Sequence, residues 1–450
     1  MKKILAGIAF LAMSTQMAYA TQARLIALGL DELDNEGSYY IQDQRNIFLN
    51  SAQVYNYADS AVFELGGIGR NVSGNSVATV DQDNLVKAQG GFFKKVGEIV
   101  YGAYLGNESN TSSFLRIASA SNAASVNFSG TNSAPQLVPT ADNQLDLFAA
   151  GQLNSGVKWG ANLVYMNNEN ENTKQEDKAG AVRLGLIGEK WDAHANISFM
   201  NEGKNEVTTN AASSIGSGNT GGTVTQEFEG KLGVHLGGSY SLGKGRLYGF
   251  YKSFKWDQKD SFNYAGWNNV TAGTSTVQAG KNGTAEGKFD TYSVGYGVTE
   301  AVNSNGTLFS NVQFKSVDIE LKLANTVQVK NTIVPLTVGY EHAATSWLTL
   351  RGSLTHNLYG DRDNKNFNSA NLVVQNLVKD IYGNEGKGSI PNSTRVNAGA
   401  TLTFGNLNID GVIGTSTLSR AGTADTQSRT QNGVLALDNL MTRVAATYRF

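Results

Sequence analysis

Residues 157–165 read VKWGANLVY, and apolar and polar side chains alternate along this stretch. This alternation is the main evidence for the fold class. Trp159, Leu163 and Tyr165 fall on one face, while Lys158 and Asn162 fall on the other. A repeat of two residues indicates a β-strand with one apolar face. The same alternation recurs at 181–187, 232–242, 292–298, 348–354 and 396–404. The chain is therefore predicted to be all-β.

The connectors between the predicted strands are sorted by length. About sixteen strands can be placed, near 60–67, 84–95, 98–107, 144–152, 157–167, 179–188, 191–202, 228–242, 246–256, 288–300, 307–322, 332–343, 347–358, 394–404, 407–417 and 439–450. Short connectors lie at 96–97, 154–156, 243–245, 344–346 and 405–406, and long ones at 108–143, 203–227, 257–287, 359–393 and 418–438. Only the link at 323–331 is ambiguous. A soluble sandwich has no reason to alternate in this way, whereas an outer-membrane barrel has short periplasmic turns and long extracellular loops. Residues 60–450 are therefore predicted to form a transmembrane, antiparallel, up-and-down β-barrel.

The first twenty residues indicate export. Lys2 and Lys3 precede an apolar run at 4–13, and 18–20 read AYA, a small-residue cleavage site. The apolar run is too short to cross roughly 30 Å of hydrocarbon as a helix. Residues 1–20 are therefore predicted to be a cleaved signal peptide, and the mature chain to be an integral protein of the outer membrane.

Composition excludes several classes of function. The chain has no cysteine, which excludes disulfides, thiol catalysis and Cys-ligated metals. Its net charge of −2 is unlike that of nucleic-acid-binding proteins, and nucleic acid is not an expected partner. The 4 histidines form no zinc motif. His356 near Ser353 is the best candidate for a catalytic pair, but a lone histidine on a strand is usually structural. We expect no enzyme activity, no cofactor and no metal.

The C-terminal strand adds a resemblance. Val444, Ala446, Tyr448 and Phe450 alternate with more polar residues, and Phe450 ends the chain. In this the chain resembles porin-like β-barrels of the Gram-negative outer membrane. The resemblance implies that Tyr448 and Phe450 belong to a signal read by the barrel assembly machinery. It also implies contact with outer-membrane lipid and lipopolysaccharide, and it leaves a homo-oligomer open.

The polar face of the predicted strands carries charges of both signs. Arg or Lys facing lipid at mid-depth costs roughly 2–4 kcal/mol, so this face should line the interior. The candidate pore-lining residues are Lys158, Arg183, Asp318, Glu320, Glu341, Arg351, Arg395 and Arg443. A barrel of about sixteen strands is wide enough for an aqueous channel.

Residues 21–59 precede the first strand and form either a periplasmic segment or a plug. The segment contains Ala23-Arg24, Asp43 and the run 46–52, which reads NIFLNSA. This pattern is similar to the start of fatty-acid-transporter (FadL-like) barrels, although Ser51 stands where that family has proline. The resemblance implies fourteen strands, a plug and a hydrophobic substrate.

Two main functions follow from these observations. The leading prediction is a porin that lets small hydrophilic solutes and ions diffuse passively. The alternative is a plugged barrel that transports hydrophobic compounds. A structural or surface-interaction barrel without an open pore is a third hypothesis.

Overall fold

The fold is taken from a computed structural model of the chain. It describes residues 21–31, 36–66, 87–107, 144–170, 175–209, 222–264, 270–272, 275–277, 283–322, 326–367, 384–390, 394–415 and 440–450. The predicted signal peptide at 1–20 lies outside these residues.

Among the described residues, three short helices precede the barrel. They are α2 (Gln22–Ala27), η1 (Gln44–Ile47) and η2 (Ser51–Tyr57). The side chain of Asp43 caps η1 by accepting from the Arg45 amide, and that of Asn50 caps η2 by accepting from the Ala52 amide. No helix among the described residues is long and apolar enough to span a membrane.

The remaining elements are strands. They are β1 (Ser60–Gly66), β2 (Lys87–Val96), β3 (Ile99–Leu105), β4 (Leu145–Gln152), β5 (Lys158–Asn170), β6 (Gln175–Ile187), β7 (Trp191–Thr209), β8 (Gly222–Gly230), β9 (Gly233–Leu242), β10 (Gly245–Tyr264), β11 (Val270–Ala272), β12 (Ser275–Val277), β13 (Gly283–Asn303), β14 (Gly306–Lys322), β15 (Thr326–Ala343), β16 (Leu348–Asn364), β17 (Gly386–Ser389), β18 (Thr394–Phe404), β19 (Leu407–Thr415) and β20 (Leu440–Arg449). All except β11 and β12 belong to one sheet.

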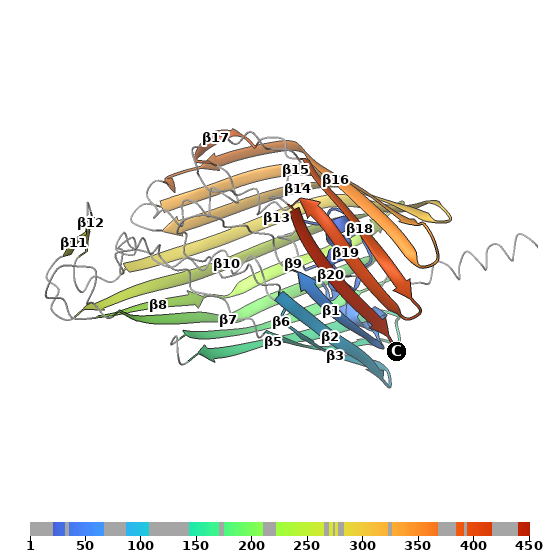
Figure 1. The fold of residues 1–450 in the computed structure, drawn as a ribbon, viewed down its shortest axis with the longest axis horizontal. Coiled ribbons are helices and arrows are strands. Elements are labelled where there is room, and N and C mark those ends of the chain that lie inside the picture. Colours follow the sequence, from blue (N-terminus) through green and yellow to red (C-terminus); the bar gives the residue numbers. More distant parts are fainter. Residues whose placement is uncertain are drawn as a thin grey trace, which may run out of the picture.

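The sheet closes into an antiparallel barrel because β1 pairs with both β2 and β20 (Figure 1). β8 and β9 both lie between β7 and β10, and β17 and β18 both pair with β16. Each of these couples is one barrel strand in two pieces, so the barrel has 16 strands. The prediction of about sixteen is confirmed, and the fourteen implied by the FadL-like resemblance is not.

Several strands run farther than predicted at the end that carries the long connectors. The strand predicted at 191–202 extends over Trp191–Thr209, and the strand predicted at 332–343 begins at Thr326. The ambiguous link at 323–331 shrinks to the three residues between β14 and β15. The alternation of apolar residues stops at the membrane boundary, whereas backbone pairing continues beyond it, so the pattern underestimates strand length.

The two faces of β20 are sorted as predicted. On β20, Arg443, Ala445 and Thr447 are buried inside the barrel, while Val444 and Tyr448 are about half exposed on the outside. The outer band is apolar because it faces hydrocarbon. This closed barrel with an apolar outer band is the architecture of integral outer-membrane proteins.

The two ends of the barrel differ, and we name them by their connectors. The turn rim carries the short links 97–98, 188–190, 243–244, 304–305 and 405–406, and the opposite end is the loop rim. At the loop rim the wall is uneven: β13 has 21 residues and β1 has 7. Figure 1 shows β10 and β13–β16 extending well past β1–β3 and β18–β20.

Candidate functional site

The described part of 21–59 lies inside the barrel, in the half next to the turn rim. We call residues 21–31 and 36–58 the plug. Through hydrogen bonds, ion pairs and packing contacts the plug touches each of the 16 barrel strands. Every residue of α2 is buried. The plug therefore occupies the cross-section of the lumen at this level.

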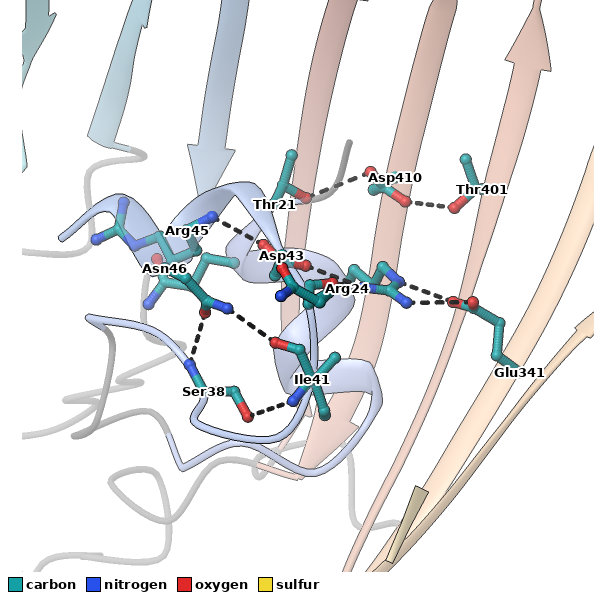
Figure 2. A network of polar contacts seen from close by, with 12 residues as sticks. Thr21, Arg24, Ser38, Ile41, Asp43, Arg45, Asn46, Glu341, Thr401 and Asp410 are labelled. Carbon is teal, nitrogen blue, oxygen red and sulfur yellow. Dashed lines mark hydrogen bonds and ion pairs between the residues drawn. The ribbon is translucent and has the colours of Figure 1, made fainter. Parts of the chain in front are cut away.

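One side of the plug is held by ion pairs centred on Arg24 of α2 (Figure 2). Its Nε and Nη2 donate to the two carboxylate oxygens of Glu341 on β15, at 2.8 and 3.2 Å. Its Nη1 donates to Asp43 Oδ2 at 3.2 Å. Asp43 also accepts from the Arg45 amide at 2.9 Å. A single guanidinium thus joins α2, the start of η1 and the barrel wall.

The network continues along the wall. Arg351 Nε donates to Glu341 at 3.0 Å, and Arg351 Nη1 donates to Asp410 Oδ1 at 2.9 Å. The Thr401 hydroxyl donates to the same Asp410 oxygen. The Thr21 hydroxyl, at the start of the plug, donates to Asp410 Oδ2 at 3.4 Å. Glu341 and Arg351, both predicted to line the interior, therefore neutralise each other and bind the plug.

Two further predicted arginines bind the plug directly. Arg395 Nη1 lies 3.2 Å from Asp31 Oδ2, and its Nη2 donates to the Gly29 carbonyl at 3.2 Å. Arg443 Nη1 donates to Gln22 Oε1 at 2.6 Å. These arginines hold both ends of the segment that contains α2.

The remaining basic candidates face the plug from β5 and β6. Lys158 Nζ donates to Asn56 Oδ1 at 2.5 Å and lies 5.4 Å from the centre of the Tyr55 ring. Arg183 forms an ion pair with Asp146, which is fully buried on β4. Sequence reasoning identified these charges as interior but did not identify the groups that they contact.

Asp318 and Glu320 do not face the interior, which corrects the prediction. They alternate with Ile319 and Leu321, which are 2% and 4% exposed, and Asp318 pairs across the outer surface with Lys330 at 3.5 Å. β14 continues past the apolar band at this level. Charges can therefore face outward there without facing hydrocarbon.

The opposite side of the plug is seated by apolar packing. Phe48 contacts the Tyr104 ring edge-on, with centroids 4.8 Å apart. The cluster comprises Ile47, Phe48, Val54 and Tyr57 from the plug with Val62, Phe93, Val100, Tyr104, Phe148 and Ala150 from β1–β4. All of these side chains are buried, so the hydrophobic effect stabilises this contact.

Glycines in the wall allow the plug to approach closely. A Cβ atom on Gly160 would lie 2.3 Å from the Ser51 carbonyl carbon, and one on Gly185 would lie 1.9 Å from Asn50 Oδ1. Asn50 Nδ2 in turn donates to the Leu186 carbonyl at 3.2 Å. The plug backbone rests directly on the strand backbones at these positions.

Burial changes the pKa of two acidic groups in the plug. Burial raises the pKa of Asp43 to about 7, against the opposing influence of Arg24 and of the Arg45 amide. Burial alone would also raise the pKa of Glu36, but the ammonium of Lys252, 2.5 Å away, outweighs it and lowers that pKa. The two carboxyl groups therefore titrate in different pH ranges.

Beyond the plug, toward the loop rim, the inner wall is apolar on the long strands. Strand register aligns Phe254, Phe289, Ile319 and Val329 in one row across β10, β13, β14 and β15. The next row contains Trp256, Leu321 and Val327, and Phe228 stacks on Trp256 from β8. We call these eight residues the apolar wall. Interiors of water-filled barrels are polar, so this surface is not that of an aqueous channel.

The two residues of the candidate catalytic pair do not meet in the structure. Ser353 is buried on the inner face of β16, whereas His356 alternates onto the outer face and lies 2.9 Å from Thr394 Oγ1. The best catalytic pair in the sequence is therefore split between the two faces. Within the described ranges, no group of three His, Asp or Glu residues could hold a metal ion.

The two residues of the predicted assembly signal lie at the turn rim. Tyr448 is 48% exposed on the outer face. The Phe450 amide donates to the Asp59 carbonyl at 3.1 Å, and Lys94 Nζ lies 5.1 Å from the centre of the Phe450 ring. Their role in assembly stays a prediction.

The prediction of a general diffusion porin is wrong. An open channel requires a continuous water-filled lumen, and the plug contacts the wall around the whole circumference at the turn-rim half. Glu341, Arg351 and Arg395, which were expected to face permeating ions, are instead paired with the plug or with buried wall charges.

Comparisons with known proteins were made by sequence and by structure. No protein-family model and no curated protein matches the chain. Among solved structures, the Ralstonia pickettii toluene transporter TbuX matches with 12% identity and a TM-score of 0.39, covering 97% of this chain and 99% of that one. A Pseudomonas aeruginosa FadL homologue has 13% identity and a TM-score of 0.41, covering 94% and 98%. The Pseudomonas putida toluene transporter TodX has 12% identity and a TM-score of 0.37, covering 97% and 100%.

Proposed function

We propose that this chain is an outer-membrane transporter of hydrophobic compounds. The apolar wall is the single observation that carries the proposal. In a lumen that carries hydrophilic solutes, the positions of Phe254, Phe289 and Ile319 would hold polar residues. Contact of aligned aromatic and aliphatic side chains with water is unfavourable in free energy. Here these side chains form rows on adjacent strands of the long side of the barrel.

The plug gives the second half of the argument. A plug that touches the wall on all sides stops free diffusion of ions, and the apolar wall lies between the plug and the loop rim. A hydrophobic compound arriving from outside gains free energy on that wall by leaving water, at about 25 cal/mol per Å² of apolar surface. The toluene transporters TbuX and TodX suggest small hydrocarbons as first candidates for the cargo.

Uptake of labelled toluene by cells that express the chain tests the proposal. Expression should increase uptake relative to cells without it, and Ile319→Glu should reduce the increase by about tenfold, the effect of roughly 1.4 kcal/mol. Glu320→Gln is the matched control, because this neighbour faces outward. If Ile319→Glu leaves toluene uptake unchanged while small sugars enter freely, the proposal is wrong.

A further inference from the structure

One aromatic side chain of the plug lies in a slot of the barrel wall. The Tyr39 ring stacks on Tyr248 with centroids 4.8 Å apart and planes 6° from parallel. It also stacks on Phe250 at 6.1 Å and on His194 at 5.8 Å. Its hydroxyl lies 3.0 Å from His194 Nε2. We call the space bounded by Gly237, His194, Tyr248 and Phe250 the ring slot.

The missing side chain of Gly237 makes room for the ring. A Cβ atom at this position would lie 2.5 Å from the Tyr39 hydroxyl oxygen and 2.8 Å from the His194 ring. Near-parallel stacking of this kind selects flat rings, since aromatic pairs gain free energy beyond their buried area. The slot thus has the width, the stacking faces and the one polar contact needed for a single hydroxylated ring.

The surroundings of the slot contain polar atoms whose hydrogen bonds are not made. His194 Nδ1 and both ring nitrogens of His235 are buried without a hydrogen-bond partner, and His235 is 7% exposed. The two imidazoles contact each other edge-on, with centroids 4.7 Å apart. Buried polar atoms are nearly always satisfied, so this concentration is a feature of binding sites rather than of packed walls.

A cavity beside the slot allows the ring to move. It has a volume of about 80 Å³ and is lined by Tyr39 and Tyr40 of the plug and by Asp192 and Arg246 of the wall, with other plug residues. A water molecule takes up about 30 Å³ of liquid, so the cavity holds two or three waters. Rotation of the Tyr39 side chain toward this space would empty the slot while the remainder of the plug stays seated.

From these observations, and resting on the proposed function, we propose that the ring slot is a binding site for a single aromatic ring that carries a hydroxyl group, and that Tyr39 occupies it as a built-in competitor. Among hydrophobic compounds, the slot would therefore favour phenols over plain hydrocarbons and over acyl chains. The ligand hydroxyl would take the place of the Tyr39 hydroxyl at His194 Nε2, and its ring would take the place between Tyr248 and Phe250.

Calorimetric titration of the purified full chain in detergent with 4-methylphenol tests the proposal, with a micelle-only titration subtracted. Tyr39→Leu should tighten binding by about tenfold or more, because a site occupied by a competitor nine-tenths of the time loses that factor in apparent affinity. Tyr39→Phe should give an affinity between those of the natural chain and Tyr39→Leu, since its ring still fills the slot but lacks the hydrogen bond to His194. Tyr55→Leu is the matched control: this plug tyrosine lies beside Lys158 of β5 and lines neither the slot nor the cavity, so the change should leave binding as it is.

Two further variants distinguish the slot from nonspecific binding. In the Tyr39→Leu background, Gly237→Ala should abolish binding because its Cβ atom would lie only 2.5 Å from the position of the hydroxyl oxygen. In the same background, His194→Leu should make 4-methylphenol and toluene bind equally, where the hydrogen bond otherwise favours the phenol about three- to tenfold. Heat-modifiable migration on gels verifies that each variant is folded.

The results separate this proposal from the proposed function. Equal affinity in Tyr39→Leu and the natural chain, or binding that survives Gly237→Ala, overturns the ring slot even if expressing cells take up toluene. Tight, Gly237-dependent binding in a protein that does not increase uptake of any hydrophobic compound would instead support the slot and contradict transport.

Discussion

The plug is seated against two unlike walls. On the side of β15–β20 it is held by the buried charges of Arg24, Glu341, Arg351 and Asp410. On the side of β1–β4 it is held by the apolar cluster around Phe48. Both contacts exclude water, but they respond differently to damage. Removing one partner of a buried ion pair strands the other charge, whereas removing an apolar side chain leaves a cavity of limited cost.

The two kinds of contact together explain how the plug is both tightly bound and held in one position. Apolar contacts stabilise any arrangement that buries similar area, so they hold the plug without specifying its register. The bidentate pair between Arg24 and Glu341 tolerates little displacement, because both of its hydrogen bonds depend on the same planar geometry. The charged side therefore selects one position for α2, and the apolar side supplies much of the free energy of docking.

The largest expected effect is on the charged side. Glu341→Leu leaves Arg24 and Arg351 without their shared carboxylate and should weaken plug docking by about 3–5 kcal/mol. The measurement is cleavage of the plug by trypsin in a barrel that remains heat-modifiable. Glu300→Ala, which removes an exposed partner of Lys244 at the turn rim, should leave the plug protected.

A double variant sharpens that prediction. Arg24→Met combined with Glu341→Leu removes the bidentate pair and leaves Arg351 bound to Asp410. Docking should be stronger in the double variant than in Glu341→Leu alone, because it also removes the buried guanidinium that has lost its bidentate partner. If the loss of docking in the double variant equals the sum of the losses in Arg24→Met and in Glu341→Leu, the two residues are not coupled. The charged side of the plug would then respond to damage as the apolar side does.

The apolar side should give a smaller loss. Ile47→Ala removes a side chain that is 1% exposed and should weaken docking by about 2–4 kcal/mol through lost burial and the cavity left behind. Urea titration of trypsin resistance measures the change. The loss should not depend on salt or pH, in contrast to losses on the charged side.

At the wall glycines the damage comes from added volume, whereas Ile47→Ala removes volume. Gly160→Ala places a Cβ atom 2.3 Å from the plug backbone and should weaken docking by about 1–3 kcal/mol through overpacking. Gly411→Ala, where a Cβ atom meets nothing within 4 Å, is the matched control and should leave trypsin resistance as it is. Equal behaviour of the two variants would show that the plug does not rest on β5.

Docking of the plug should also depend on pH. Because the pKa of Asp43 is raised to about 7 in the docked plug, from an ordinary value of 3.8, docking is strongest when this group is protonated. Docking should therefore weaken as pH rises from about 4 to about 7, and level off above that. The pKa of Glu36 is lowered instead, so its ionisation changes docking in the opposite direction.

Asp43→Asn isolates this contribution. The variant should lose the part of the pH dependence that the natural chain shows between pH 4.5 and 7.5, as measured by the pH profile of hydrogen exchange in α2 after correction for intrinsic rates. An unchanged profile would assign the pH dependence to other groups.

Much of the barrel could be predicted from the sequence. Alternation at 157–165 and its repeats located the strands, and β18 begins and ends at the predicted residues 394 and 404. The face assignment of Arg351 and Leu350 was also predictable, since a bilayer makes the outer face apolar wherever it covers the strand. Beyond the bilayer this rule has no force. The alternation therefore misplaced Asp318 and Glu320 and gave strands too short at the loop rim.

The site was less accessible to sequence reasoning. Segment 21–59 carried the apolar run 47–49 and the resemblance to plugged transporters, but neither identifies which wall residue meets Arg24 or Tyr39. Glu341 is 317 residues from Arg24 along the chain, and Gly237 is nearly 200 residues from Tyr39. Such pairings depend on how far each strand is shifted along its neighbour, and no local pattern in one strand records that shift.

The membrane barrel follows from the sequence alone, because a strand that contacts hydrocarbon on one face must alternate apolar and polar side chains. Whether the lumen is an open channel for ions or is filled by the plug could be learned only from the tertiary structure. Lys158, Arg395 and Arg443 are equally suited to facing water and to binding a plug, since a hydrated charge and a paired charge have the same residue type. Closure of the barrel around the plug brought these charges to their partners, so the lumen is plugged and not an open pore.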